Sequence, residues 1–169
     1  EYNDSNGGSS RYSIINKENK NILINKKNII KALNYEKKFK LDKIDTYLKF
    51  EKKIQKIKET CNRKINSILN LNQKIHGYGA STKGNVILQY FDIDNKKIDF
   101  ISDRNPFKNN RYTPGTRIKI ISEKKSRSLK PNYYFVLPWH FKKEILNREI
   151  KIRKKNTKFI FPLPKFYII

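Results

Sequence analysis

The spacing of apolar residues predicts one long helix in the middle of the chain. From about Asp45 onward, apolar residues recur at intervals of three and four, which places them on a single helical face. This face comprises Tyr47, Phe50, Ile54, Ile57, Cys61, Ile65 and Ile68. Asp42 or Asp45 is suited to cap the start of the helix. We expect the helix to cover a sheet, with Cys61 as a small core residue.

After Lys74 the chain alternates between strand and helix patterns. Apolar runs predict strands at 75–78, 98–102, 118–121, 133–137 and 159–162, and helices at 83–91 and 139–156. This alternation predicts an α/β fold: a Rossmann-like, mostly parallel sheet with flanking helices, preceded by the long amphipathic helix. The last seven residues predict a final strand or sheet edge.

The pattern is weaker before residue 41. Residues 1–10 are typical of a loop or tail, and 12–16 form a short β-like run. The polar segment 17–40 carries a small apolar patch, Ile29, Ile30 and Leu33, which predicts a short helix at best. We therefore expect an N-terminal tail over 1–40 and a Rossmann-like domain over 41–169.

The charge of the chain raises the question of a polyanionic partner. Its 169 residues include 39 Lys and Arg against 15 Asp and Glu, for a net charge of +24. The lysines are scattered among Asn and Ile without interleaved aromatics, which favours a solvated surface over a nucleic-acid interface.

The remaining composition argues against several site types. A single cysteine excludes an internal disulfide, and with only two histidines we expect no metal site. No apolar run has the length of a membrane span, and the start does not have the pattern of a signal peptide. These features predict a cytoplasmic protein that does not enter a membrane.

The strongest motif is the glycine-rich segment 76–85, which reads HGYGASTKGN. It lies where a predicted strand becomes a helix, a position suited either to holding a phosphate or simply to making a tight turn. Its spacing departs from a dinucleotide fingerprint because Gly84 lies five residues after Gly79. Asn85 and Val86 replace the Lys and Ser or Thr of a Walker loop, which excludes a P-loop NTPase.

Three further segments follow predicted strands or turns. In Asp103-Arg104-Asn105-Pro106, the acid could accept from hydroxyls and the arginine could bind a phosphate, or the segment is only an Asn-Pro turn. The turn 112–116 offers two threonines. Segment 137–141 places Trp139 beside His140, suited to stacking on and bonding a base or sugar, although local hydrogen bonding is the simpler role for the histidine. We identify no catalytic set.

Taken together, the blocks GYGASTKGN, DRNP, YTPGT, LPWHF and KFIFPLP resemble the C-terminal domain of SAM-dependent sugar C-methyltransferases, over roughly residues 41–165. The stretch 7–12 is similar to the segment that closes the family's central methyltransferase domain. The resemblance implies a Rossmann-like domain that holds a nucleoside-diphosphate sugar against a SAM-binding domain.

The resemblance implies a set of ligand-facing residues in this chain. They are Gly77, Gly79, Ala80, Ser81, Thr82, Lys83, Gly84, Asn85, Arg104, Asn105, Thr113, Gly115, Thr116, Trp139 and His140.

Several features of the family are missing from this sequence. It has no zinc-binding Cys cluster, no His-Glu-His-type segment and no upstream SAM-binding unit. We therefore expect a C-terminal fragment or free-standing remnant that binds no cofactor itself and lacks methyl transfer alone. SAM and a methyltransferase domain, in cis or in trans, are implied for the full-length enzyme. The alternative is a basic module that binds nucleic acid or an acidic partner, and a third possibility is a fragment that only docks on a separate methyltransferase domain.

Overall fold

The structure is a computed structural model that describes residues 1–19, 21, 22 and 24–169. Its internal contacts divide the chain into two units, Glu1–Ile54 and Gln55–Ile169, which are described separately. The boundary lies inside helix α2 (Ile44–Asn70).

The first unit contains few contacts that bury side chains. A small antiparallel pair, β1 (Tyr2–Asn3) and β2 (Ser9–Ser10), is joined by the 3-10 turn η1 (Ser5–Gly7). Helix α1 (Lys26–Lys38) begins after Asn25, whose side chain accepts from the Asn28 N–H, and it has no buried residue. The start of α2 is similarly exposed, with Tyr47 52% and Phe50 63% accessible.

The second unit is built on a six-stranded sheet in the order β5-β4-β3-β6-β7-β8. The strands are β3 (Ile75–Tyr78), β4 (Phe100–Asp103), β5 (Lys119–Ser122), β6 (Tyr133–Val136), β7 (Lys158–Phe161) and β8 (Tyr167–Ile168). All neighbouring pairs are parallel except β7 and β8. This arrangement confirms the predicted α/β fold with a mostly parallel sheet.

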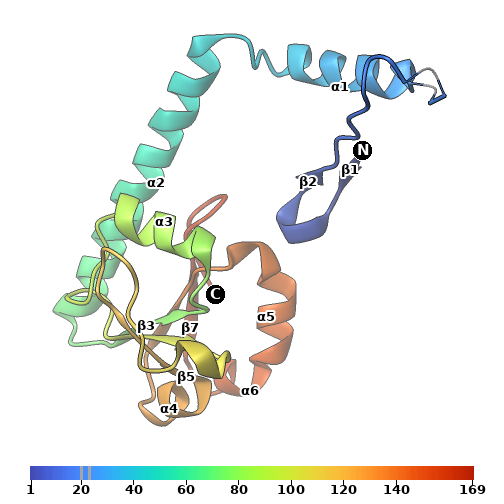
Figure 1. The fold of residues 1–169 in the computed structure, drawn as a ribbon. Coiled ribbons are helices and arrows are strands. Elements are labelled where there is room, and N and C mark those ends of the chain that lie inside the picture. Colours follow the sequence, from blue (N-terminus) through green and yellow to red (C-terminus); the bar gives the residue numbers. More distant parts are fainter. Residues whose placement is uncertain (20, 23) are drawn as a thin grey trace. The chain divides into compact units, whose positions relative to one another are not determined.

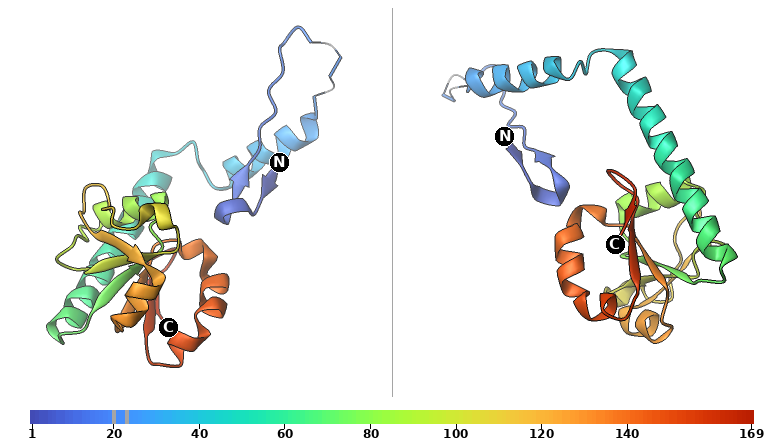
Figure 2. Two further views of the ribbon diagram at one scale, coloured as in Figure 1. Left: turned by 60° about the horizontal axis from the view of Figure 1, so that its bottom comes forward. Right: turned by 180° about the vertical axis from the view of Figure 1, so that it is seen from behind.

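Helices cover both faces of this sheet (Figures 1 and 2). The later part of α2 and helix α3 (Thr82–Tyr90) lie on one face, where the Asn62 amide donates to the Phe91 carbonyl at 2.8 Å. On the other face, α5 (Lys142–Arg148) and α6 (Ile150–Arg153) cover aromatic residues of the strands. Ile145 and Leu146 pack there against a cluster that includes Tyr78, Tyr134 and Phe159. Shorter helical segments are η2 (Pro106–Lys108), α4 (Glu123–Ser128) and η3 (Trp139–Phe141).

The long helix forms as predicted, but only half of its apolar face is covered. Ile57, Cys61, Ile65 and Ile68 are buried, as expected for a helix that packs on a sheet. The residues of the same face that precede Ile57 stay half-buried or exposed. Asp45 falls inside the first turn of the helix instead of before it, and there its charge still favours the helix N-terminus.

Three local predictions were wrong. Residues 12–16 form no strand, because the short strands of this region pair across 2–3 and 9–10 instead. Segment 17–40 contains a 13-residue helix where a short one was expected. The predicted helix over 139–156 is divided into η3, α5 and α6, with Glu149 between the last two.

His76 occupies a buried position in the central strand. It is 1% exposed, its Nδ1 lies 2.8 Å from the Ser126 hydroxyl, and that hydroxyl lies 2.9 Å from Tyr134 Oη. Burial lowers the pKa of His76 to about 4, with Asp99 opposing the shift and Lys74 adding to it. The imidazole therefore stays neutral at physiological pH.

Within the described residues, no helix is both long and apolar enough to cross a bilayer.

We predict that His76 makes the protein less stable in mild acid. Its folded pKa of about 4 lies below the unfolded value of 6.5. The unfolded chain therefore takes up the proton first as the pH falls from about 6.5 toward 4, and about 3 kcal/mol of unfolding free energy is lost across that window. NMR titration of the imidazole signals should show that His76 stays neutral down to about pH 4. Urea unfolding of His76→Gln should show a weaker pH dependence, whereas titration of His76 near pH 6.5 would contradict the prediction.

Candidate functional site

A cavity lies at the point where the strand order of the sheet reverses. The chain runs outward from β3 through β4 to β5, then returns to place β6 on the other side of β3. Loops that leave the carboxyl ends of β3 and β6 therefore diverge, which is where open α/β sheets bind ligands. The cavity has a volume of about 530 Å³ and is lined from the β3–α3 loop, the end of β4, the end of β6 and helix α5. We call it the carboxyl-end cavity.

The glycine-rich loop forms one wall, but most of its backbone donors are already used. The Gly79 N–H donates to the Ser102 carbonyl at 2.7 Å, and the Ala80 N–H donates to the Asp103 carboxylate at 2.7 Å. At the start of α3 the Gly84 N–H donates to Ser81 Oγ at 3.1 Å. The loop is thus held by the chain's own acceptors and does not offer these N–H groups to an anion.

The Asp103 carboxylate holds this wall together through several hydrogen bonds. Besides Ala80, its carboxylate accepts from the Asn105 N–H at 2.8 Å and from Lys108 Nζ at 3.3 Å. The same ammonium donates to the Ala80 carbonyl at 2.7 Å. Arg104, between these residues, is exposed, and in the described part of the chain its side chain forms no hydrogen bond or ion pair. Its guanidinium is available to a ligand.

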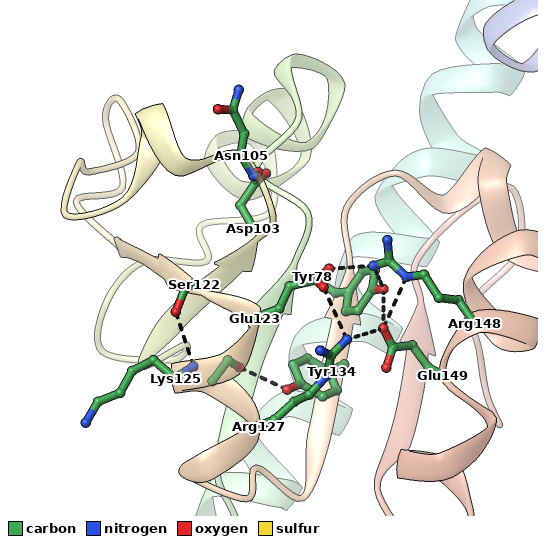
Figure 3. A network of polar contacts seen from close by, with 11 residues as sticks. Tyr78, Asp103, Asn105, Ser122, Glu123, Lys125, Arg127, Tyr134, Arg148 and Glu149 are labelled. Atoms are coloured by element: carbon green, nitrogen blue, oxygen red, sulfur yellow. Dashed lines mark hydrogen bonds and ion pairs between the residues drawn. The ribbon is translucent and has the colours of Figure 1, made fainter.

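A buried carboxylate lies deeper, beside the cavity. Glu149 is 2% exposed, and its Oε1 accepts from Tyr78 Oη at 2.8 Å, from Arg127 at 2.8 Å and from Arg148 Nε at 3.3 Å. Arg148 also contacts Tyr78 Oη and the carboxylate of Glu123. Figure 3 shows these side chains converging from β3, α4 and the end of α5.

The contacts of this cluster shift the pKa values of Tyr78, Arg127 and Arg148. Burial raises the pKa of Tyr78, and the bond to Glu149 raises it further, so the phenol stays protonated. Burial lowers the pKa of both arginines, but their contacts outweigh it. The hydrogen bond to Glu149 raises the pKa of Arg127. The contacts to Tyr78, Glu123 and Glu149 raise the pKa of Arg148. The pair of arginines therefore stays charged around one buried acid.

Five of the residues predicted to face a ligand line this cavity: Gly79, Ala80, Ser81, Arg104 and Asn105. The other ten lie outside its lining. Gly77 is inside β3, where a Cβ would come within 2.7 Å of the Ile101 side chain, so it serves packing. Thr82, Lys83, Gly84 and Asn85 belong to α3, and Trp139 and His140 to η3.

The predicted threonine turn is closed on itself. Thr113 and Thr116 are buried, their hydroxyl oxygens lie 2.7 Å apart, and Thr113 Oγ1 accepts from the Ile118 N–H at 2.9 Å. Gly115 adopts a φ of +76°, a left-handed conformation that favours glycine. The hydroxyls of this turn are therefore committed to the chain itself.

Two polar atoms near the glycine-rich loop are buried without a partner. Within the residues that the structure describes, Asn85 Oδ1 and His140 Nδ1 form no hydrogen bond. Burial and the nearby Lys83 lower the pKa of His140. Unpaired buried polar atoms are costly, and in native proteins they often mark contacts to a ligand or partner.

Several cavity residues were not predicted from the sequence. They are Tyr78, Lys108, Glu123, Pro138, Phe141, Glu144, Ile145 and Arg148. Glu144 and Arg148 are four residues apart, on one face of α5. This spacing could have indicated that the two side chains lie together. The contacts of Glu149 reach 71 residues back to Tyr78 and 22 to Arg127, so no local pattern indicates them.

The comparisons with known proteins agree with this architecture. Residues 4–164 match a family model described as the C-methyltransferase C-terminal domain. A curated relative, the C-methyltransferase NovU of Streptomyces niveus, is 28% identical over 123 residues, which is 73% of this chain. The match spans 29% of the length of NovU.

We predict that Gly84→Ala destabilises the second unit. A Cβ at this position would lie 2.5 Å from Leu137 Cβ and 2.9 Å from Ser81 Oγ. Leu137 is fully buried, so α3 would have to shift, at a cost of about 1–3 kcal/mol in unfolding free energy. Val86→Ala, at a 65% exposed position of the same helix, should change stability by less than about 0.5 kcal/mol. Urea unfolding measures both, and a stabilised Gly84→Ala would contradict the close packing.

We also predict that the Tyr78 hydroxyl stabilises the fold. Tyr78→Phe removes a donor to the buried Glu149 carboxylate and should cost about 1–2 kcal/mol. Tyr133 provides the control, because this buried tyrosine of β6 forms no side-chain hydrogen bond in the described part of the chain. Chemical denaturation should therefore find Tyr133→Phe close to the parent protein. Equal losses in the two variants would count against a special role for Tyr78.

Proposed function

The chain belongs to the C-methyltransferase C-terminal domain family, and from this premise we propose that its carboxyl-end cavity binds the nucleotide-sugar substrate of a longer methyltransferase. The supporting observation is the cavity of about 530 Å³ at the switch point between β3 and β6. A volume of this size suits a nucleotide-sized ligand.

Arg104 is the proposed contact to the diphosphate. Its guanidinium is exposed at the cavity wall and carries no partner among the described residues, so no internal bond has to break when it binds an anion. Asp103, next to it, is already engaged with Ala80 and Lys108 and fixes the backbone from which Arg104 extends. A guanidinium forms two parallel hydrogen bonds with a phosphate, which suits it to this role.

Two further residues of the lining are suited to hydroxyl groups. Glu144 of α5 is exposed and has no hydrogen-bond or ion-pair partner in the described region, and Asn105 follows Arg104 after β4. Carboxylate and amide groups accept from and donate to sugar hydroxyls. We infer that these two residues orient the sugar, and that the Trp139 and His140 pair, with the unpaired Asn85 oxygen, lies next to the bound ligand or its partner domain.

SAM, the cofactor implied for the full-length enzyme, is proposed to be bound outside residues 1–169. In a dinucleotide site, an acid at the end of the second strand accepts from a ribose hydroxyl. Here that acid is Asp103, and it accepts from Ala80, Asn105 and Lys108 instead. The residues present therefore do not fit an adenosine ribose at this position. Methyl transfer would depend on the rest of the longer protein.

The apolar residues of the first unit support a partner domain. Ile44, Tyr47, Leu48 and Phe50 on α2 are 46–70% exposed, and α1 carries Ile29, Ile30 and Leu33 in the same state. NovU is more than three times as long as the segment it shares with this chain, so most of that relative lies outside the shared segment. We propose that a SAM-binding methyltransferase domain, in cis or in trans, covers part of this apolar surface.

We predict that dTDP binds and that Arg104→Ala weakens the binding about tenfold, the value of one charge-assisted contact. Isothermal titration calorimetry of the chain with dTDP measures the dissociation constants. Because the Arg104 side chain has no described partner, the variant should keep the stability of the parent protein.

Arg111→Ala is the matched control. Arg111 is also exposed, lies seven residues further along the chain and is outside the cavity lining. Its substitution removes the same charge and should leave the dissociation constant within about twofold. An absence of binding heat at millimolar dTDP with folded protein, or equal effects of the two substitutions, would overturn the proposed site.

A further inference from the structure

A second cavity lies at the opposite, amino-terminal edge of the sheet. Its volume is about 590 Å³, and its rim is formed by the segments that enter β6 and β7, together with α6 and the end of α4. Unlike the carboxyl-end cavity, it does not lie at a reversal of the strand order, because β6 and β7 are neighbouring parallel strands. We call this the amino-end cavity.

Its charge differs sharply from that of the carboxyl-end cavity. Five cationic side chains line the amino-end cavity, namely Arg127, Lys130, Arg148, Lys151 and Lys155, against the single acid Glu149. The carboxyl-end cavity instead balances Arg104, Lys108 and Arg148 with Asp103, Glu123 and Glu144. Of these two cavities, the amino-end cavity therefore carries the cationic excess.

The three lysines of this cavity form no ion pair with the acid in its lining. Glu149 is already bound by Arg127 and Arg148. In the described part of the chain, Lys130, Lys151 and Lys155 form no side-chain hydrogen bond or ion pair, and all three are exposed. Like charges that converge on one concave surface repel one another, and an anion placed between them relieves that repulsion.

The rim of the cavity is held in place by bonds that do not involve the lysines. Thr157 Oγ1 donates to the Pro131 carbonyl at 3.2 Å, and the Lys158 N–H donates to the Asn132 carbonyl at 3.0 Å. Asn132 Oδ1 accepts from the Lys74 N–H at 2.8 Å. The loops before β6 and β7 are thus fixed to each other, so the cavity is present before any ligand arrives.

We propose that the amino-end cavity binds a small phosphate-bearing anion through Lys130, Lys151 and Lys155, at a site separate from the carboxyl-end cavity. Phosphate groups match this site because several ammonium groups can each donate to different oxygens of one ligand. The cavity volume suits a polyphosphate or a nucleoside phosphate. A polynucleotide is less favoured, because the three unpaired lysines line a bounded cavity rather than an extended groove with stacking aromatics.

The test is an NMR titration of ¹⁵N-labelled protein with inorganic pyrophosphate at low ionic strength. We expect the amide signals of Lys130, Asn132 and residues 151–157 to shift. The double variant Lys151→Gln/Lys155→Gln should weaken binding about tenfold or more, as expected when two charged contacts are lost.

The matched control is Lys52→Gln/Lys56→Gln, two exposed lysines with the same i, i+4 spacing on α2. This pair removes the same net charge and should leave the pyrophosphate dissociation constant within about twofold. The dissociation constant is taken only from amides that line the amino-end cavity, so that any binding of pyrophosphate at Arg104 in the carboxyl-end cavity is measured separately.

Three outcomes would overturn the proposal. One is the absence of shifts in these amides up to ~10 mM pyrophosphate, a limit that corresponds to very weak binding. Another is equal weakening by both double variants, which would indicate attraction to net charge alone. The third is selective binding of a single-stranded oligonucleotide with steep salt dependence and no response to pyrophosphate, which would identify a nucleic-acid surface.

Discussion

The hydrogen bonds to the buried Glu149 carboxylate are the interactions on which the elements around both cavities depend. The carboxylate is almost fully buried, and it remains compatible with the core because Tyr78 and two arginines donate to it. A buried charge without such partners would cost several kcal/mol, so the positions of its donors are tightly constrained. Those donors belong to the central strand, to α4 and to the end of α5. One acid thereby fixes the relative placement of the elements that surround both cavities.

The glycine-rich loop has the sequence of a phosphate-binding turn, but most of its backbone N–H groups bond within the chain. Asp103, the last residue of β4, already accepts from the Ala80 N–H that an anion would use. The glycines have packing reasons of their own: Gly84 lies against Leu137, and Gly79 has a φ of +78° with Pro138 close by. The loop therefore forms a wall of the cavity whose backbone donors are used within the chain, and the contact to an anion is proposed for Arg104 instead.

The sequence predicted much of the fold, because the relevant signals are local. Short apolar runs that end at turn residues mark the strands. The bounds of β3 agree with the prediction, and those of the other strands differ by a few residues. The break at Glu149 was not predicted because the apolar spacing continues through it, and its side chain bonds to residues far away in the sequence. Helix α4 was missed because its six residues are polar, although Ser122 accepts from the Lys125 N–H as an N-cap. Five predicted residues line one cavity, because they follow strands whose carboxyl ends lie at the same edge of the sheet. The cavity residues on α5 were not predicted, because their position depends on how that helix packs.

Arg148 is present in the lining of both cavities. Its guanidinium reaches Glu123 on one side and Glu149 on the other, and it cannot strengthen a contact in one direction without altering its geometry in the other. Thermodynamic linkage is reciprocal: a ligand that displaces this side chain from one cavity changes the affinity of the other cavity, and the second ligand must return the same coupling free energy to the first. The two cavities thus share the Arg148 guanidinium, so a ligand that moves it in one cavity is expected to change the affinity of the other.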